Sequence, residues 1–175
     1  MKRRFKLIVA LITVFTFYGR SQVNYTPFDE KAIAIDSFNH LVIKSNLRVV
    51  LIESERTDSA RIEGIKDFAD KVLIVRSGNR LIVRANSFKD LKKEGTIYIP
   101  VKSLRSIEVH DDAKVISYSI IRSPQLDLLI EGNCTVSIIL KGKLNILKGE
   151  DYNYSFKRIY ENSNTPTYQQ SIFNH

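Results

Sequence analysis

Residues 107–113, 126–134 and 144–151 read IEVHDDA, LDLLIEGNC and LNILKGED, and these three blocks decide the fold. In each block an apolar strand runs into a short corner of small or polar residues. The corners begin 21 and 17 residues apart. A repeat of one strand and one corner is typical of a solenoid, in which each coil buries its apolar side chains against its neighbours. We predict an all-β, parallel β-helix-like stack; the alternative is an antiparallel β-sandwich with evenly spaced hairpins.

Residues 38–100 have a different texture, in which apolar and polar side chains alternate. The alternating apolar pairs are Leu41 and Ile43, Val49 and Leu51, Leu81 and Val83, and Ile97 and Ile99. Alternation at this spacing places one set of side chains on a single face of a strand. Ser77-Gly78-Asn79, between VLIV and LIV, predicts a hairpin turn. The sequence therefore predicts a hairpin-rich N-terminal part ahead of the stack.

The N-terminus has the three-part pattern of a secretory signal peptide. Four cations among the first six residues precede the apolar run LIVALITVFTFY, and Gly19-Arg20-Ser21 follows it. This order predicts a signal peptide over residues 1–21 that is cut between Ser21 and Gln22. The apolar run has 12 residues, which is shorter than the ~20 residues that span a bilayer. An uncleaved anchor and a buried N-terminal element are the alternatives.

The net charge of +8, from 27 basic and 19 acidic residues, is due mostly to this segment. Residues 1–21 hold five of the basic residues and none of the acidic ones, so the predicted mature chain has 22 basic and 19 acidic residues, or +3. Nucleic-acid binding needs a concentrated basic patch, whereas the mature chain mixes both signs along its strands. We therefore predict no nucleic-acid partner.

Five further features occur in a fixed order: a Phe with an alternating strand, a second strand, a Gly-turn hairpin, a strand ending in Pro, and a Leu-x-x-Ile. They lie at residues 38–43, 48–52, 68–83, 96–100 and 104–107. In this order the chain from Phe38 to about Leu147 resembles the putative auto-transporter adhesin head GIN domain family of secreted Bacteroidota proteins. That family repeats Ser-Gly-Ala-Ser-like corners, whereas the corners here read HDDA and EGNC, and only Gly132 and Gly149 keep the glycine.

The resemblance implies a right-handed β-helix-like stack and a binding role at the surface or in the periplasm. With it, the predicted organisation has four parts. These are a signal peptide at 1–21, a lead-in segment at 22–37, a head GIN-like β domain at 38–160 and a polar C-terminal tail at 161–175.

His110, Asp111 and Asp112 form the tightest polar cluster in the sequence. A histidine with two carboxylates has the chemistry to bind a divalent metal or to support acid–base catalysis. Neighbouring residues of a strand point to opposite faces, so the three side chains converge only if the corner bends sharply. The competing interpretation is a solvated β-corner with Asp in turn positions.

Tyr152, Tyr154 and Phe156 alternate with polar residues, so their rings are expected on one face of a strand. The functional interpretation is a stripe for glycan stacking or protein docking. The structural interpretation is that the rings cover the final coil. Cys134 is the single cysteine, so an intramolecular disulfide is excluded, and we predict that it packs as a small apolar residue.

The sequence has no phosphate loop, dinucleotide fingerprint, nucleophile elbow or HExxH motif. We therefore predict an exported, non-enzymatic module of the periplasm or cell surface, with a binding, adhesive or structural role and no cofactor. The expected partner is an envelope protein or a glycan, and no membrane span remains after signal cleavage. The alternative is a small periplasmic metal-binding protein or enzyme that uses His110, Asp111 and Asp112. The oligomeric state stays open.

Overall fold

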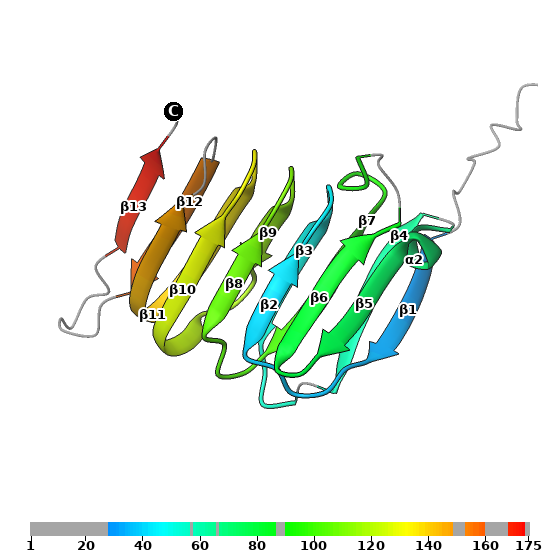
Figure 1. The fold of residues 1–175 in the computed structure, drawn as a ribbon, viewed down its shortest axis with the longest axis horizontal. Helices are drawn as coiled ribbons and strands as arrows, with labels where there is room; N and C mark the ends of the chain where they lie inside the picture. The colour runs from blue at the N-terminus through cyan, green and yellow to red at the C-terminus, as the bar shows by residue number, and fades with distance from the viewer. Residues whose placement is uncertain are drawn as a thin grey trace, which may run out of the picture.

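The computed structural model describes residues 28–56, 58–65, 67–86, 90–148, 153–159 and 168–173, which form a right-handed stack of β-coils (Figure 1). The central coils are built from β2 (His40–Ile43), β3 (Arg48–Glu53), β8 (Ser106–Val109), β9 (Lys114–Ser117), β10 (Ile121–Ile130) and β11 (Thr135–Lys148). Neighbouring coils pair in parallel, β2 with β8, β3 with β9, β8 with β10 and β9 with β11. This pairing confirms the predicted all-β stack and excludes the antiparallel sandwich.

The coils do not follow one another in sequence order. After β3 the chain forms β4 (Ser59–Ile65), the single helical turn α2 (Phe68–Lys71), β5 (Val72–Ser77), β6 (Arg80–Ala85) and β7 (Gly95–Val101). β6 pairs in parallel with β2, and β7 with β3. The coil β6–β7 therefore lies on one side of β2–β3, and β8–β9 lies on the other. The predicted hairpin between β5 and β6 is confirmed.

Further strands close both ends of the stack. β1 (Phe28–Ala34) pairs antiparallel with β4, and it lies within the predicted lead-in. At the other end β12 (Asn153–Ile159) pairs parallel with β11, and β13 (Tyr168–Phe173) pairs antiparallel with β12. A solenoid end exposes unpaired backbone groups, so strands that cover it protect it from pairing with other chains. The boundaries predicted for the four parts of the chain stay predictions.

The helical turn α2 plugs the end of the stack beside β4 and β7. Its Phe68 is 1% exposed. A Cβ atom placed on Gly64 or Gly95 would collide with the Phe68 ring. These two glycines are therefore required because the ring lies directly on the backbone of both strands.

The sheet folds over on itself and forms two layers. Sheet 1, which faces the viewer in Figure 1, contains β5, β6, β2, β8, residues 125–130 of β10 and residues 143–148 of β11. Sheet 2 contains β1, β4, β7, β3, β9, residues 135–140 of β11, β12 and β13. β11 crosses between the layers at Gly142, where φ is 141° and a Cβ atom would overlap the carbonyl of Ser123.

The core lies between the layers and repeats from coil to coil. In sheet 1 the register places Leu41 beside Ile107, and Ile107 beside Leu128. In sheet 2 it places Val49 beside Val115, and Val136 beside the same Val115. These side chains are at most 1% exposed. The period-two pattern of the sequence therefore fixes which side chains enter the core, because each inward residue meets an apolar residue of the next coil.

Candidate functional site

Three corners stack where sheet 1 turns into sheet 2, at residues 44–47, 110–113 and 131–134, and we call them the upper turn column. Ile43 pairs with Val109, and Val109 with Ile130, so the corners that follow these residues lie in register. The second residue of each corner has positive φ: 74° at Ser45, 57° at Asp111 and 90° at Gly132. The last residues, Leu47, Ala113 and Cys134, are fully buried. The corners predicted at 110 and 131 are therefore stacked, as expected for a solenoid.

Hydrogen bonds between corners hold the upper turn column together. The Asp111 carboxylate accepts a bond of 2.8 Å from the backbone N–H of Ser45. The Asn46 side-chain oxygen accepts a bond of 3.2 Å from the backbone N–H of Asp112. Bonds of this kind satisfy backbone donors that a sharp turn removes from the ladder. Asp111 therefore has a structural partner in the neighbouring coil.

The corner does not bring His110, Asp111 and Asp112 together. The ring of His110 turns towards sheet 1, where its Nδ1 lies 2.7 Å from Oε2 of Glu131. Asp111 bonds towards the neighbouring corner, and Asp112 is exposed. Within the part of the chain that the structure describes, no three His, Cys, Asp or Glu side chains are grouped to hold a metal ion. The three side chains therefore do not form a metal-binding group in the described part of the chain, and the acid–base hypothesis stays a prediction.

Cys134 is packed beneath the same corner. Its Sγ lies 3.0 Å from the carbonyl oxygen of Asp111 and 3.3 Å from that of Glu131. Burial raises the pKa of the thiol to about 11. Because the thiolate is the nucleophilic form, the raised pKa disfavours a nucleophilic role for this cysteine at neutral pH. It is a core residue, as predicted.

A polar network lies on the outward face of sheet 1, which we call face 1. Its centre is Glu108, whose side chain is 19% exposed. Nε2 of His40 lies 2.8 Å from Oε1 of Glu108, and Nη2 of Arg80 lies 2.9 Å from Oε2. His110 Nε2 lies 3.8 Å from the same Oε2, and its Nδ1 continues the network to Glu131. Side chains of three coils therefore meet at the Glu108 carboxylate, and His110 extends the network to Glu131 on a fourth coil.

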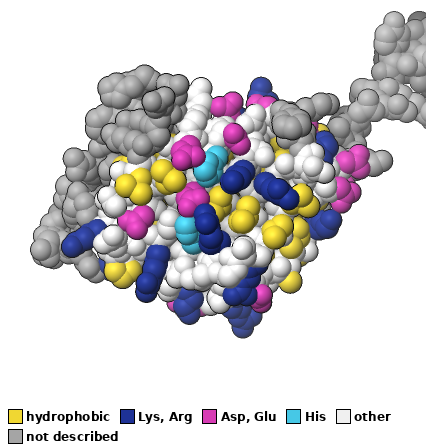
Figure 2. All heavy atoms as spheres, in the orientation of Figure 1, with side chains coloured by type: hydrophobic (Ala, Val, Ile, Leu, Met, Phe, Trp, Pro, Cys, Tyr) yellow, Lys and Arg dark blue, Asp and Glu magenta, His cyan; other side chains and the backbone are white. Residues whose placement is uncertain are grey.

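Apolar side chains lie on both sides of the histidines near the middle of this face (Figure 2). The registers of five strand pairs define one cross-strand row over the whole of sheet 1: Val75, Ile82, Val42, Glu108, Leu129 and Leu147. At the two ends of this row Val75 is 46% exposed and Leu147 is 51% exposed. Leu73, on the same edge strand as Val75, is 38% exposed. Face 1 thus has an ionic centre between two exposed apolar margins.

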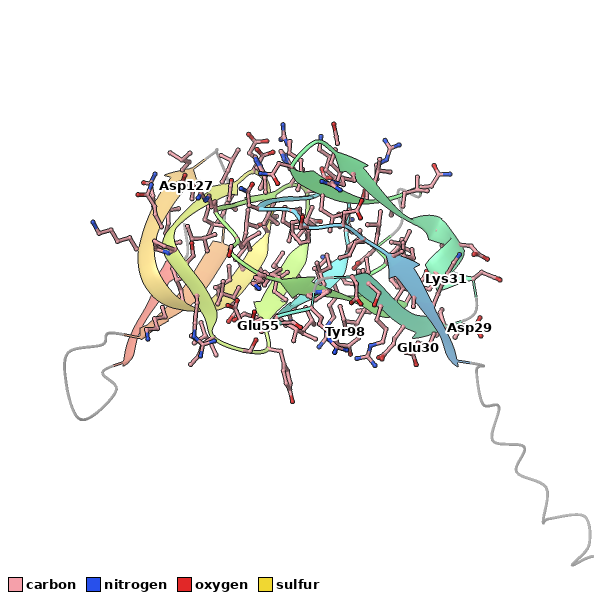
Figure 3. All side chains as sticks on the ribbon, turned by 90° about the horizontal axis from the view of Figure 1, so that it is seen from below. Asp29, Glu30, Lys31, Glu55, Tyr98 and Asp127 are labelled. Carbon is pink, nitrogen blue, oxygen red and sulfur yellow. The ribbon has the colours of Figure 1, made fainter. Side chains whose placement is uncertain are left out.

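The two layers carry their outward side chains to opposite sides of the molecule. Seen from below, Asp127 of sheet 1 and Tyr98 of sheet 2 lie on opposite sides (Figure 3). The rings proposed as a docking stripe cannot be placed on either side, because Tyr152 and the side chains of Tyr154 and Phe156 lie outside the described residues. Their role stays a prediction.

The sequence predicts the outward position of Glu108 on face 1 but not the partners of this carboxylate. Alternation in Ile107-Glu108-Val109 indicates that Glu108 points outward. Its partners His40 and Arg80 lie 68 and 28 residues away in the chain. Only the non-sequential order of the coils brings these strands together, and no local pattern encodes that order.

A family model described as "putative auto-transporter adhesin, head GIN domain" matches residues 37–147. A putative adhesin from Parabacteroides merdae is similar in fold, at 22% identity and a TM-score of 0.57, over 71% of this chain and 53% of that one. A putative adhesin from Parabacteroides distasonis has 12% identity and a TM-score of 0.49, over 75% and 71% of the two chains. A putative lipid binding protein from the same species has 11% identity and a TM-score of 0.48, over 75% and 63%.

The chain spans about half the length of the Parabacteroides merdae protein. None of the curated proteins compared with the sequence gave a match. In the described part of the chain, no helix has the length and apolar character needed to cross a membrane.

Proposed function

The chain belongs to the family described as "putative auto-transporter adhesin, head GIN domain", and on that premise we propose that it is an exported, non-catalytic module that binds a protein of the cell envelope through face 1. The family membership supports a surface or periplasmic location. The predicted signal peptide over residues 1–21 supports the same location from the sequence.

The observation that carries the proposal is the cross-strand row of face 1. Protein interfaces combine a desolvated apolar area with a limited number of placed polar groups. Apolar side chains that stay exposed on one face are a feature of interaction sites. Face 1 has this composition, with Leu73, Val75 and Leu147 exposed on its two margins and Glu108 already paired at its centre.

The chemistry of face 1 favours a protein over a glycan as its partner. Sugar rings are bound by stacking on aromatic side chains. Among the described outward residues of sheet 1 there is no Phe, Tyr or Trp. Branched aliphatic side chains such as those of Val75 and Leu147 instead fit apolar side chains of another protein. The partner is therefore a protein with a complementary apolar patch.

We propose a non-catalytic module because its potentially reactive side chains make structural contacts. Cys134 is a buried thiol with a raised pKa. Asp111 bonds to the backbone of the next corner, and Glu108 is saturated by His40 and Arg80. A nucleophile or general base must be within hydrogen-bond reach of its substrate. These groups are occupied by structural partners instead.

The test uses the full chain and detergent-extracted envelope proteins of the producing bacterium. The protein is immobilised as the unaltered chain and as the variants Leu147→Asp and Ser137→Asp. Leu147 is exposed on sheet 1 and Ser137 is exposed on sheet 2, so both variants add one charge to an exposed site. We expect one protein species to be retained by the unaltered chain and by Ser137→Asp, and to be lost with Leu147→Asp. Equal retention by all three would contradict the proposal.

A further inference from the structure

β5 is an edge strand, and no strand in the described part of the chain pairs with its outer side. The path of the sheet begins with β1 and ends with β5. β5 pairs with β6 on its inner side. In Figure 1 it is the last strand of sheet 1, at the end of the stack where β1 also lies. A further strand could therefore add to sheet 1 along this edge.

The ladder between β5 and β6 shows which backbone groups face the outer side. The N–H of Asn86 donates to the carbonyl of Lys71, so these residues form a hydrogen-bonded pair at the end of the ladder. Such pairs alternate with non-hydrogen-bonded pairs along an antiparallel ladder, and Ile74–Val83 is one of the latter. The carbonyl of Val83 agrees with this, because it accepts from the N–H of Lys44 on the side away from β5.

The backbone N–H and C=O groups of Ile74 and Arg76 therefore point away from β6, to the outer side of the edge. In the described part of the chain these groups have no hydrogen-bond partner. Apolar side chains lie beside them: Leu73 and Val75 are 38% and 46% exposed on face 1, and Ile74 is partly buried against the core. Strand addition uses both features, since backbone bonds give affinity and alternate side chains give specificity.

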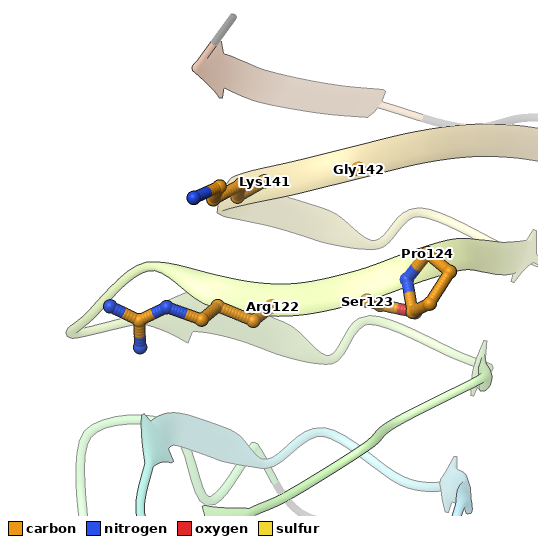
Figure 4. Close-up of a pocket in the computed structure, with 5 residues that line it drawn as sticks. All are labelled: Arg122, Ser123, Pro124, Lys141 and Gly142. Carbon is orange, nitrogen blue, oxygen red and sulfur yellow. The ribbon is translucent and has the colours of Figure 1, made fainter. Parts of the chain in front are cut away.

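β5 lacks the devices that protect edge strands from pairing, which are charged residues, proline and bulges. β1, at the other end of the path, carries three charged residues in succession at 29–31. Elsewhere Pro124 and Gly142 lie where the register of β10 on β11 shifts (Figure 4). In β5, residues 72–75 read VLIV, and the register on β6 is continuous. The edge is therefore open to a partner strand.

The nearby strand β1 does not close this edge. Nζ of Lys31 lies 3.1 Å from Asp70, just before β5, and Arg76 lies 2.6 Å from Asp36, just after β1. These four side chains are at least 42% exposed, and exposed ion pairs contribute little to stability. No backbone ladder joins β1 to β5 in the described part of the chain.

The charge beside the edge indicates which strand it would bind. Residues 71–86 contain four cations and no acidic residue. All of these cations except Arg84 have a carboxylate partner. Arg84 is exposed beside its register partner Leu73, and within the described residues it has no ion pair. A second copy of the chain would bring two such cationic hairpins together, whereas an acidic side chain on an added strand would complement Arg84.

We propose that β5 binds an extended segment of the envelope partner as an additional strand, with apolar side chains beside Ile74 and Val75 and a carboxylate on Arg84. The inference rests on the proposed function, because it takes the partner of face 1 to be a protein and specifies how that protein is bound. The segment should be acidic opposite Leu73 and apolar opposite the next two residues of β5.

The test measures binding of labelled peptides to the full chain by fluorescence anisotropy. The probe is the peptide TEVVVET, which reads the same in both directions and so fits a parallel or an antiparallel strand. One control is TKVVVKT, which reverses the charge. The other is TEVVVET with every valine N-methylated, which removes the backbone donors of its centre. We expect the probe to bind and both controls to bind about tenfold more weakly or less.

The matched protein variants are Arg84→Glu and Arg48→Glu, which alter exposed arginines on sheet 1 and sheet 2. Arg84→Glu should raise the Kd of TEVVVET about tenfold and improve binding of TKVVVKT, whereas Arg48→Glu should change either Kd by less than about twofold. Thermal unfolding checks that both variants keep the fold. Equal weakening by the two variants would show attraction to net charge alone and would overturn the proposal.

Three further outcomes would also overturn it. They are equal binding of TEVVVET and its N-methylated form, no binding of TEVVVET, and a dimer of the unaltered chain that TEVVVET dissociates in sedimentation, which would place a second copy on β5. The retention experiment with Leu147→Asp tests the proposed function separately. Specific binding of TEVVVET with equal retention by Leu147→Asp would contradict binding through face 1 and leave strand addition to β5 standing.

Discussion

The two sheets have the same kind of inner face and different outward faces. Inside, both stack Val, Ile and Leu from coil to coil. Outside, sheet 1 leaves Val75 and Leu147 about half exposed at its margins. Sheet 2 covers its apolar centre: the Arg61 guanidinium lies 4.4 Å from the centre of the Tyr98 ring, and Val50 beyond Tyr98 is only 7% exposed.

This difference shows that inward positions serve the packing of the core, whereas outward positions are available for binding. Inward positions are constrained by the next coil, so both sheets must satisfy them in the same way. Outward positions are constrained only by solvent. The described part of sheet 2 covers its apolar centre with Arg and Tyr and leaves Ile65 36% exposed at one margin, whereas sheet 1 exposes apolar side chains at both margins, as expected of a face that binds a partner.

The largest expected effect concerns Gly142, where β11 passes from one face to the other. In Gly142→Ala the new methyl group overlaps the Ser123 carbonyl at a φ of 141°. We expect a loss of about 3 kcal/mol in the free energy of unfolding. The control is Gly78→Ala, which also has positive φ but open space around it, so its cost should be about 1 kcal/mol. Urea denaturation measures both; equal losses would mean that β11 does not bend as described.

The next largest effect is expected at the centre of face 1. Glu108→Ala leaves His40 and Arg80 without their carboxylate, at a site that is largely buried. We expect a destabilisation of about 1–2 kcal/mol. The matched variant on sheet 2 is Glu63→Ala, at a side chain that is as buried as that of Glu108 (20% exposed). It removes one short ion pair, 2.6 Å to Arg61, whereas Glu108→Ala removes two, so a smaller loss of about 0.5 kcal/mol is expected. A greater loss at Glu63 would reverse the comparison.

A smaller, pH-dependent effect is expected at Glu53, on an inward position at the lower end of sheet 2. Burial raises the pKa of this carboxyl above 4.5, although the backbone N–H of Arg122 partly offsets the shift. The folded state therefore favours the protonated form, and its stabilising contribution is lost as the pH rises through the raised pKa. Glu53→Gln should match the unaltered chain near pH 4 and become the more stable of the two by pH 7. Unfolding curves at several pH values measure the difference, and a gap that narrows with rising pH would contradict the assignment.

The smallest effect is expected when either face is altered at an exposed position. Leu147→Asp and Ser137→Asp should each change the free energy of unfolding by less than about 0.5 kcal/mol, because neither side chain contributes to the core. Thermal unfolding provides the measurement. A large loss with Leu147→Asp would show that this leucine supports the fold, and it would then be unsuitable as a probe of binding.

The repeating part of the fold could be predicted from local pattern. The alternation at Leu41 and Ile43 and the spaced corners at residues 110 and 131 both depend on neighbours within one coil, and both predictions were confirmed. The placement of β6–β7 beside β2–β3 depends on contacts between distant segments, which no short-range period records. The same limit applies to Glu108 and its partners.

The corner at His110 shows that residue type alone is insufficient to predict a metal site. Three polar residues in sequence have the chemistry of a metal site, but the left-handed backbone at Asp111 sends its carboxylate to the next coil and leaves His110 on face 1. Likewise, residues 144–147 were predicted as a separate strand, whereas they are the second half of β11, which bends at Gly142. Both outcomes depend on backbone dihedral angles that composition does not specify.

The most direct test of the account is site-specific photo-crosslinking in cells that express the full chain. A photoreactive residue is placed at Val75, at Leu147 or at Ser137, in three separate variants. The account predicts one protein adduct of the same mass from Val75 and Leu147, which lie at opposite margins of face 1, and no such adduct from Ser137 on sheet 2. An adduct formed equally from Ser137, or no adduct from either position on face 1, would contradict it.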